Sequence, residues 1–268
     1  MTRRTSAGTD LSADPRAGLL RRYFRAVLGD QATGDRLARA LWSAPEDAPF
    51  APDAAAVDAA SVLLDAMRRW RRLHNDPAPA AAFSPGAIAQ ALSPAAAQQR
   101  QVGVLIDVFG LTVPQTATAL DRSEGEVTVL LSAARAAART PLGCHVLVVE
   151  DDPLVAQHLA HLAREGGAEG VSVARGARAA FDSASRARPG IVLCDYDLGE
   201  GPNGAEIVRR LASEHDAVCI FVTAYPNAVL SGTDGEPAFI IEKPFRESVV
   251  RAALSYAGTA ERPVVLAA

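Results

Sequence analysis

The sequence predicts an all-α N-terminal domain followed by an α/β domain built on a doubly wound, five-stranded parallel sheet. Apolar residues in the first 140 positions recur at helical spacing. From Cys144 onward, short apolar runs alternate with helical segments, which is typical of a parallel sheet covered on both faces. The charge divides at the same place: residues 1–140 hold 16 arginines against 14 acids, and residues 141–268 hold 11 basic residues against 17 acids.

The N-terminal domain is expected to span residues 17–140, after a polar and disordered tail at residues 1–16. A Pro- and Ala-rich linker at 74–83 separates a first helical unit, 17–73, from a second unit, 84–140. The first unit holds apolar residues at the spacing of three helices, of which the third is expected from about Asp53 to Leu73. The domain is therefore expected to contain two helical units rather than one continuous bundle.

The second unit carries clear helix start and stop signals. Ser84-Pro85 and Ser93-Pro94 each place a capping serine before a proline at the first helical position. The second of these helices is expected to end at Gly110. A short helix over 114–120 follows, and Ser123-Glu124-Gly125-Glu126 is a capping box that opens the last helix. The sequence of helix, short turn and helix is the helix-turn-helix layout.

Five buried strands are expected within residues 144–260, before a tail at 261–268. They are His145–Val149, Val171–Val173, Ile191–Cys194, Val218–Val222 and Phe239–Ile241. In a doubly wound sheet, ligands bind at the carboxyl ends of the strands. Polar residues follow four of these strands, namely Glu150-Asp151, Asp195, Thr223 and Lys243.

These strand ends predict a site for a Mg²⁺ ion and a phosphoryl group. Mg²⁺ prefers oxygen ligands and keeps some of its waters. Asp151 and Asp195 are expected to supply carboxylates, the backbone carbonyl of Asp197 a third oxygen, and Glu150 to act through a water. Asp195 is the expected nucleophile, which would form an acyl phosphate with catalysis resting on alignment and charge neutralisation.

The phosphoryl oxygens are expected to meet three further groups. Lys243 is the only lysine in the chain, beside 26 arginines. A general bias toward arginine explains most of the arginines, but it does not explain why one position kept a lysine. A compact ammonium suits a tight pocket around a small, densely charged group better than a planar guanidinium. The Thr223 hydroxyl and the Ala224 amide are expected to bind another phosphoryl oxygen.

The runs Val146–Asp151, Leu193–Asp195, Val222–Ala224 and Lys243–Phe245 resemble the receiver domains of two-component response regulators. The resemblance implies a flavodoxin-like fold over about residues 144–260. It also implies that Asp195 takes phosphate from the phosphohistidine of a sensor histidine kinase with Mg²⁺, and that the Lys243-Pro244 peptide is cis.

One position departs from the receiver pattern. Receivers usually carry an aromatic switch residue three positions before the lysine, and here that position is Ile240. Phe239 is aromatic, but strand alternation directs it to the other face of the sheet. Tyr225 is a substitute switch candidate, and a loop tyrosine without that role fits its position equally well.

The helical half resembles a sigma factor of the extracytoplasmic-function type. Residues 17–73 are similar to the region that recognises the −10 element, and 84–140 to the region that reads the −35 element. The helix expected to read DNA begins with Glu124 and Glu126 and has no basic residue before Arg135. Because contacts with phosphate need Lys or Arg, this face argues against direct DNA binding. Its apolar side, Val127, Leu130 and Leu131, suits a protein partner or the domain core.

A sigma-like half followed by a receiver resembles the PhyR-type general stress response regulators. The resemblance implies an anti-anti-sigma factor: phosphorylation of Asp195 frees the sigma-like half to sequester a NepR-type anti-sigma factor. The alternative is a phosphorylation-gated DNA-binding transcription regulator, and a metal-dependent phosphate sink is a third possibility. No enzymatic activity is expected beyond the receiver's own phosphorylation and dephosphorylation.

Nothing in the sequence predicts a membrane partner. The N-terminus lacks the apolar segment of a signal peptide, and no apolar stretch reaches the roughly 20 residues that span a bilayer. A cytoplasmic location is therefore expected.

Overall fold

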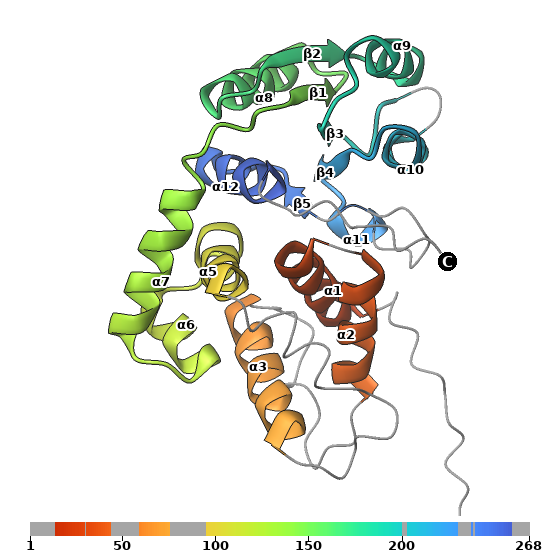
Figure 1. Cartoon of the computed structure of the whole chain (residues 1–268). Coiled ribbons are helices and arrows are strands. Elements are labelled where there is room, and N and C mark those ends of the chain that lie inside the picture. Colours follow the sequence, from red (N-terminus) through yellow and green to blue (C-terminus); the bar gives the residue numbers. More distant parts are fainter. Residues whose placement is uncertain are drawn as a thin grey trace, which may run out of the picture.

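The computed structural model describes residues 14–29, 31–43, 59–75, 95–199, 203–229, 237 and 239–258. A helical part and an α/β part lie against each other, with α5 and α1 facing α12 and β5 (Figure 1). Among the described helices, none is both long and apolar enough to cross a membrane.

Seven helical segments make up the described portion of the N-terminal part. They are α1 (Pro15–Leu28), α2 (Gln31–Ser43), α3 (Ala59–Asn75), α5 (Ala95–Gly103), the π-helix η1 (Val104–Val108), α6 (Val113–Leu120) and α7 (Glu124–Ala137). The expected beginning of the third helix before Ala59 and the two Ser-Pro caps lie outside the described residues.

Helix α1 shows why the chain becomes helical where it does. The Asp14 carboxylate accepts a hydrogen bond from the Arg16 backbone N–H, and Pro15 occupies the first turn. Gly29 ends the helix in the left-handed conformation, with φ of 70°, where a glycine carries no steric penalty. The helix therefore begins two residues before the domain boundary that the sequence suggested.

The helix that was expected to run to Gly110 changes its winding at Val104. From there the chain forms a π-helix, in which the Phe109 N–H donates to the Val104 carbonyl at 3.0 Å. The wider turn buries both Val104 and Leu105. Gly110 then leaves the helix with φ of 77°. The expected stop is confirmed, and the winding before it is a feature that the sequence pattern did not predict.

The helix-turn-helix has the capping boxes that define its helix starts. Thr112 and Gln115 cap α6, and Ser123 and Glu126 cap α7, each pair exchanging reciprocal bonds. Val127 and Leu131 pack with α5 and α6 in a small core, so these apolar residues serve the domain itself. The exposed large apolar residue on α7 is Val129, with 69% of its surface accessible.

The α/β part has the expected five parallel strands in the order β2-β1-β3-β4-β5. The strands are β1 (His145–Val149), β2 (Gly170–Ala174), β3 (Ile191–Cys194), β4 (Val218–Thr223) and β5 (Phe239–Glu242). The helices are α8 (Pro153–Glu165), α9 (Ala177–Ala187), α10 (Gly204–His215), α11 (Pro226–Val229) and α12 (Glu247–Gly258). This order belongs to the flavodoxin-like class. In that class the chain adds β2 on one side of β1 and then adds β3, β4 and β5 on the other side, so the topological switch point lies between β1 and β3.

Strand alternation sends the core residues to two opposite faces. Val146 and Val148 pack with α8 and α12, whereas Leu147 and Val149 pack with α9 and α10. Phe239 joins the first cluster, and Ile240 joins the second cluster. The predicted division of these two neighbours between the faces is confirmed.

The helical part and the sheet share a continuous apolar core. The cluster that contains Val146 and Phe239 extends into α1, α2, α3 and η1. Helix α1 lies beside β5, the edge strand, and the Arg22 guanidinium donates to the Ile240 carbonyl at 2.8 Å. An edge strand has unpaired main-chain groups, so this cover satisfies one of them. The strand that bears the expected switch position is therefore in direct contact with the helical half.

Candidate functional site

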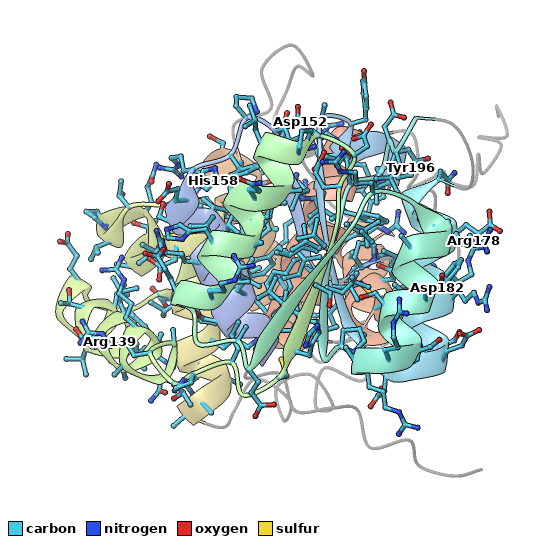
Figure 2. The ribbon with its side chains drawn as sticks, turned by 90° about the horizontal axis from the view of Figure 1, so that it is seen from above. Arg139, Asp152, His158, Arg178, Asp182 and Tyr196 are labelled. Carbon is cyan, nitrogen blue, oxygen red and sulfur yellow. The ribbon has the colours of Figure 1, made fainter. Side chains whose placement is uncertain are left out.

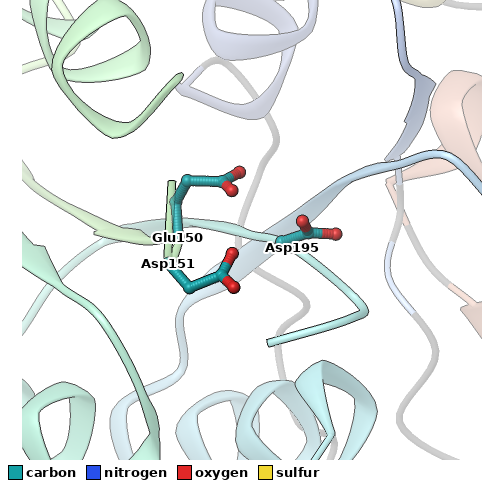
Figure 3. A group of neighbouring side chains, drawn as sticks. All are labelled: Glu150, Asp151 and Asp195. Atoms are coloured by element: carbon teal, nitrogen blue, oxygen red, sulfur yellow. The ribbon is translucent and has the colours of Figure 1, made fainter. Parts of the chain in front are cut away.

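Three carboxylates gather where β1 and β3 end. Glu150 and Asp151 follow β1, Asp195 follows β3, and one ligand oxygen from each lies within 4.8 Å of the others (Figure 3). Asp152 and Tyr196, the next residues along each loop, lie at this same end of the sheet (Figure 2). The structure thus brings together the three acids that the sequence predicted at the ends of β1 and β3. A group of carboxylate oxygens of this kind is typical of a Mg²⁺ site.

Lys243 reaches the acidic group from the end of β5. Its Nζ lies 2.6 Å from Asp195 Oδ2 and 2.8 Å from Glu150 Oε2. Burial alone would lower the pKa of Lys243, but hydrogen bonds to Asp195 and Glu150, with their charges, raise it overall. The ammonium therefore stays charged and holds two carboxylates from different strands together.

Glu150 and Asp151 are neighbours in sequence with different environments. Glu150 is 1% exposed, and burial, opposed by the Lys243 contact, raises its pKa to about 7. Asp151 is exposed. Sequence reasoning placed Glu150 behind a water near the metal and did not anticipate its direct ion pair with Lys243.

The remaining predicted residues surround this group. Thr223 is buried at the end of β4, and its Oγ1 accepts a hydrogen bond from the Tyr225 N–H at 3.0 Å. Ala224 is exposed, as is the Tyr225 side chain. The Asp197 N–H donates to Asp195 Oδ1 at 3.2 Å, which places Asp197 directly beside the acidic group.

Main-chain contacts fix how the lysine approaches. The Lys243 N–H donates to the Thr223 carbonyl at 2.8 Å, so β4 and β5 end in register. The Lys243-Pro244 peptide is cis, as the receiver resemblance implied. Asp152 caps α8 by accepting hydrogen bonds from the Leu154 and Val155 N–H groups. Its carboxylate is therefore committed to the helix start.

Gly204 is a residue of the site that sequence reasoning missed. It begins α10, and a Cβ there would lie 2.0 Å from the Asp195 carbonyl oxygen and 2.8 Å from the Tyr196 Cα. Both obstacles are backbone atoms, so they cannot rotate away. The only sequence signal was an Asn203-Gly204 pair in a loop, which also suits an ordinary turn.

Gly204→Ala should displace the main chain that carries Asp195 and reduce phosphorylation by acetyl phosphate at least about tenfold, because ångström shifts of a reacting group have effects of this order. Gly176→Ala is the matched control, since a Cβ at residue 176 meets nothing within 4 Å. The rate of phosphate incorporation measures both variants. Equal rates in the two would show that the close approach at Gly204 does not position Asp195.

Comparison with known proteins identifies the family. The Response regulator receiver domain family matches residues 146–255. The Phyllosphere-induced regulator PhyR of Methylorubrum extorquens is 30% identical over 243 residues, which are 89% of this chain and 90% of that protein. The chain belongs to the PhyR family. Its relatedness covers both halves, because the aligned length far exceeds that of the receiver.

Solved structures of PhyR proteins have the same architecture. A PhyR stress response regulator superposes with a TM-score of 0.74 at 32% identity, covering 91% of this chain and 94% of that one. The anti-anti-sigma factor PhyR of Bartonella quintana gives a TM-score of 0.70 at 25% identity, covering 91% and 92%. The chain is therefore a homologue of the anti-anti-sigma factor PhyR with a C-terminal receiver domain, and a signalling protein rather than a metabolic enzyme.

Proposed function

We propose that this PhyR homologue is a phosphorylation-activated switch that sequesters an anti-sigma factor of the NepR type and so frees a stress sigma factor. The observation that carries the proposal is the position of the acidic site. Lys243 ends β5, the strand that contacts α1 of the sigma-like half. A change at Asp195 that moves Lys243 and the end of β5 would therefore act on the strand that contacts the sigma-like half.

Phosphoryl transfer would begin at Asp195. A carboxylate oxygen of Asp195 forms a bond to phosphorus while the P–N bond of the kinase phosphohistidine breaks, and the imidazole leaves with its electron pair. Asp151, Asp195 and the Asp197 carbonyl would hold a Mg²⁺ ion, with Glu150 acting through a water, and the ion would supply charge neutralisation. Lys243 then exchanges its Asp195 contact for a phosphoryl oxygen, and the Thr223 hydroxyl and the Ala224 amide bind another.

The coupling to the sigma-like half would follow from this rearrangement. When the Thr223 hydroxyl turns toward a phosphoryl group, it would lose the hydrogen bond that the Tyr225 N–H donates to it. Lys243 would move together with the end of β5. Ile240, at the usual switch position, has an aliphatic side chain rather than an aromatic ring. The simplest way to transmit the change from the phosphate site to α1 is therefore a movement of β5 itself. Shifting a closed population to a largely open one takes roughly 3–5 kcal/mol of differential stabilisation. Binding of the partner to the open form supplies part of it.

Mg²⁺ affinity should depend on pH through Glu150. Because the folded pKa of Glu150 is about 7, raised by burial, a proton occupies this carboxylate below that pH and competes with the cation. The apparent Mg²⁺ affinity should therefore rise several-fold between pH 6 and 8, then level off. Calorimetric titrations at several pH values measure it, with Glu150→Gln expected to flatten the dependence. A flat profile in the unaltered protein would contradict this prediction.

Direct DNA binding is the alternative, and the described part of the helix-turn-helix disfavours it. The first turn of α7 presents Glu124 and Glu126. Arg135 is occupied by Asp107, with Nη2 to Oδ1 at 2.7 Å. In a gel shift at low salt, the phosphorylated protein should not retain promoter DNA, because phosphate contacts supply most of such affinity. Retention that falls steeply with added salt would favour the DNA-binding alternative.

A capture experiment tests the proposed function. Immobilised protein, with and without acetyl phosphate and Mg²⁺, is exposed to a purified NepR-type anti-sigma factor, and the bound fraction is measured. The proposal expects capture with phosphodonor and its loss in an Asp195→Ala variant. Absence of capture under both conditions would favour the phosphate sink, which has no output partner.

A further inference from the structure

Tyr256, near the end of α12, inserts its phenol into a notch in α5 of the sigma-like half. The notch exists because residue 103 is glycine. A Cβ at residue 103 would lie 1.9 Å from the Tyr256 hydroxyl oxygen and 2.6 Å from its Cζ. Tyr256 is 3% exposed. α5 and α12, which belong to different halves of the chain, lie next to each other (Figure 1). A side chain at residue 103 would therefore force Tyr256 out of its present position.

Arg100, three residues before Gly103, contacts both the main chain and the ring of the same tyrosine. Its Nη1 donates to the Tyr256 carbonyl at 2.6 Å, and its Nε donates to the Ala26 carbonyl of α1 at 2.9 Å. The guanidinium carbon lies 5.9 Å from the ring centroids of both Tyr256 and Phe239. Burial lowers the pKa of Arg100 to about 10, so it remains a cation at neutral pH. One side chain thus joins α1 and α5 to α12 and β5.

The tyrosine hydroxyl extends the contact to the helix-turn-helix. It donates to Asp107 Oδ2 at 3.3 Å, and Asp107 lies in the π-helix that follows the notch. Asp107 Oδ1 accepts from Arg135 of α7 at 2.7 Å. Burial and then the Asp107 charge raise the pKa of Tyr256, so the hydroxyl keeps its proton and acts as the donor. A continuous set of contacts therefore runs from α12 through η1 to α7.

We infer that Tyr256, seated in the Gly103 notch and held by Arg100 and Asp107, is the latch that keeps the sigma-like half closed on the receiver. Arg100, Asp107 and the Tyr256 hydroxyl are polar or charged, so water can replace their hydrogen bonds when the halves separate. Helix α12 begins at Glu247, four residues after Lys243, so a movement of Lys243 is passed to the helix that bears the latch. The effect of the latch on partner capture rests on the proposed function, but the closed state itself does not.

Gly103→Ala tests the latch in the full-length protein. Alanine has the higher helix propensity, so it favours α5 itself while its methyl group meets Tyr256. Without phosphodonor, hydrogen exchange of the α5 and α12 amides should rise on the order of tenfold, reporting the open population, while exchange in β1 stays unchanged. Gly125→Ala in α7 is the matched control, because a Cβ at residue 125 meets only Ser123 Oγ, at 4.0 Å. Exchange equal to that of the control overturns the latch.

The methyl group added in Gly103→Ala also lies 3.2 Å from Ala134 Cβ on α7, so this variant could disturb α7 as well as the Tyr256 contact. A second variant separates the two effects. Should exchange rise in α7 as well, Tyr256→Phe decides. It removes only the hydroxyl, and it should raise α12 exchange severalfold with α7 unchanged. Unaltered α12 exchange in Tyr256→Phe would then overturn the proposal. If Gly103→Ala opens the protein but captures no anti-sigma factor, the latch stands and the proposed function fails.

Discussion

Replacing Asp195 by alanine should abolish labelling of the protein by acetyl phosphate or by a histidine kinase. Asp195 is 7% exposed at the end of β3, beside Asp151 and within 2.6 Å of the Lys243 ammonium. Within the acidic group, Asp195 combines the Lys243 contact with some solvent access, because Glu150 also pairs with Lys243 but is only 1% exposed, and the described ion pairs of Lys243 are with Glu150 and Asp195 rather than Asp151. Incorporation of labelled phosphate should fall to background.

Asp197→Ala is the matched control for this experiment. It removes a neighbouring carboxylate and keeps the backbone carbonyl that is expected to bind Mg²⁺, so most of the labelling should remain. If Asp195→Ala were still labelled at the rate of the unaltered protein, the nucleophile would be another residue. If both variants lost labelling equally, the Asp197 side chain would be part of the site.

Asp35→Ala should destabilise the sigma-like half by about 3–5 kcal/mol, because it removes the carboxylate that holds two buried arginines. Arg25 is 0% exposed, and its Nε and Nη2 lie 2.7 Å and 2.6 Å from the Asp35 oxygens. Arg21, 3% exposed, lies 3.3 Å from the same carboxylate. Burial alone would raise the pKa of Asp35, but the hydrogen bonds and charges of Arg25 and Arg21 lower it overall.

Chemical denaturation measures this loss, with Glu214→Ala as the control. Glu214 pairs with Arg210 on the exposed surface of α10, where an ion pair contributes about 0–1 kcal/mol. Phosphorylation of Asp195 should persist in Asp35→Ala, because the acidic site belongs to the sheet. A loss of stability no larger than that of Glu214→Ala would show that the Arg25–Asp35 pair does not hold α1 and α2 together.

The sheet could be predicted from sequence because buried parallel strands are continuous apolar runs with polar residues at their ends. The bounds of β1 and β3 match the expectation, and their ends bring Glu150 and Asp195 together. Strand alternation alone also separated Phe239 from Ile240. These features depend on the local sequence pattern and on the topology that it implies, so a single sequence is enough to predict them.

Contacts between elements could not be predicted in the same way. The Arg25–Asp35 pair depends on how α1 and α2 cross, and the Tyr256 notch depends on where α12 meets α5. Gly103 accepts a close approach by Tyr256, which is far away in sequence, and Gly204 accepts one by the Asp195 and Tyr196 backbone across a short loop. Neither close approach can be recognised from the glycine and its sequence neighbours. For such residues the sequence pattern predicts that they lie in a helix, but it does not predict which residue of another element they contact.

The affinity for the anti-sigma factor, measured with and without phosphate on Asp195, shows whether phosphorylation makes the sigma-like half available to its partner. Calorimetry or surface binding with one purified NepR-type partner gives both values under identical salt and Mg²⁺. We expect the phosphorylated protein to bind at least about tenfold more tightly, because a binding-competent state must be released from the receiver. Equal affinities would show that phosphorylation of Asp195 does not control the sigma-like half.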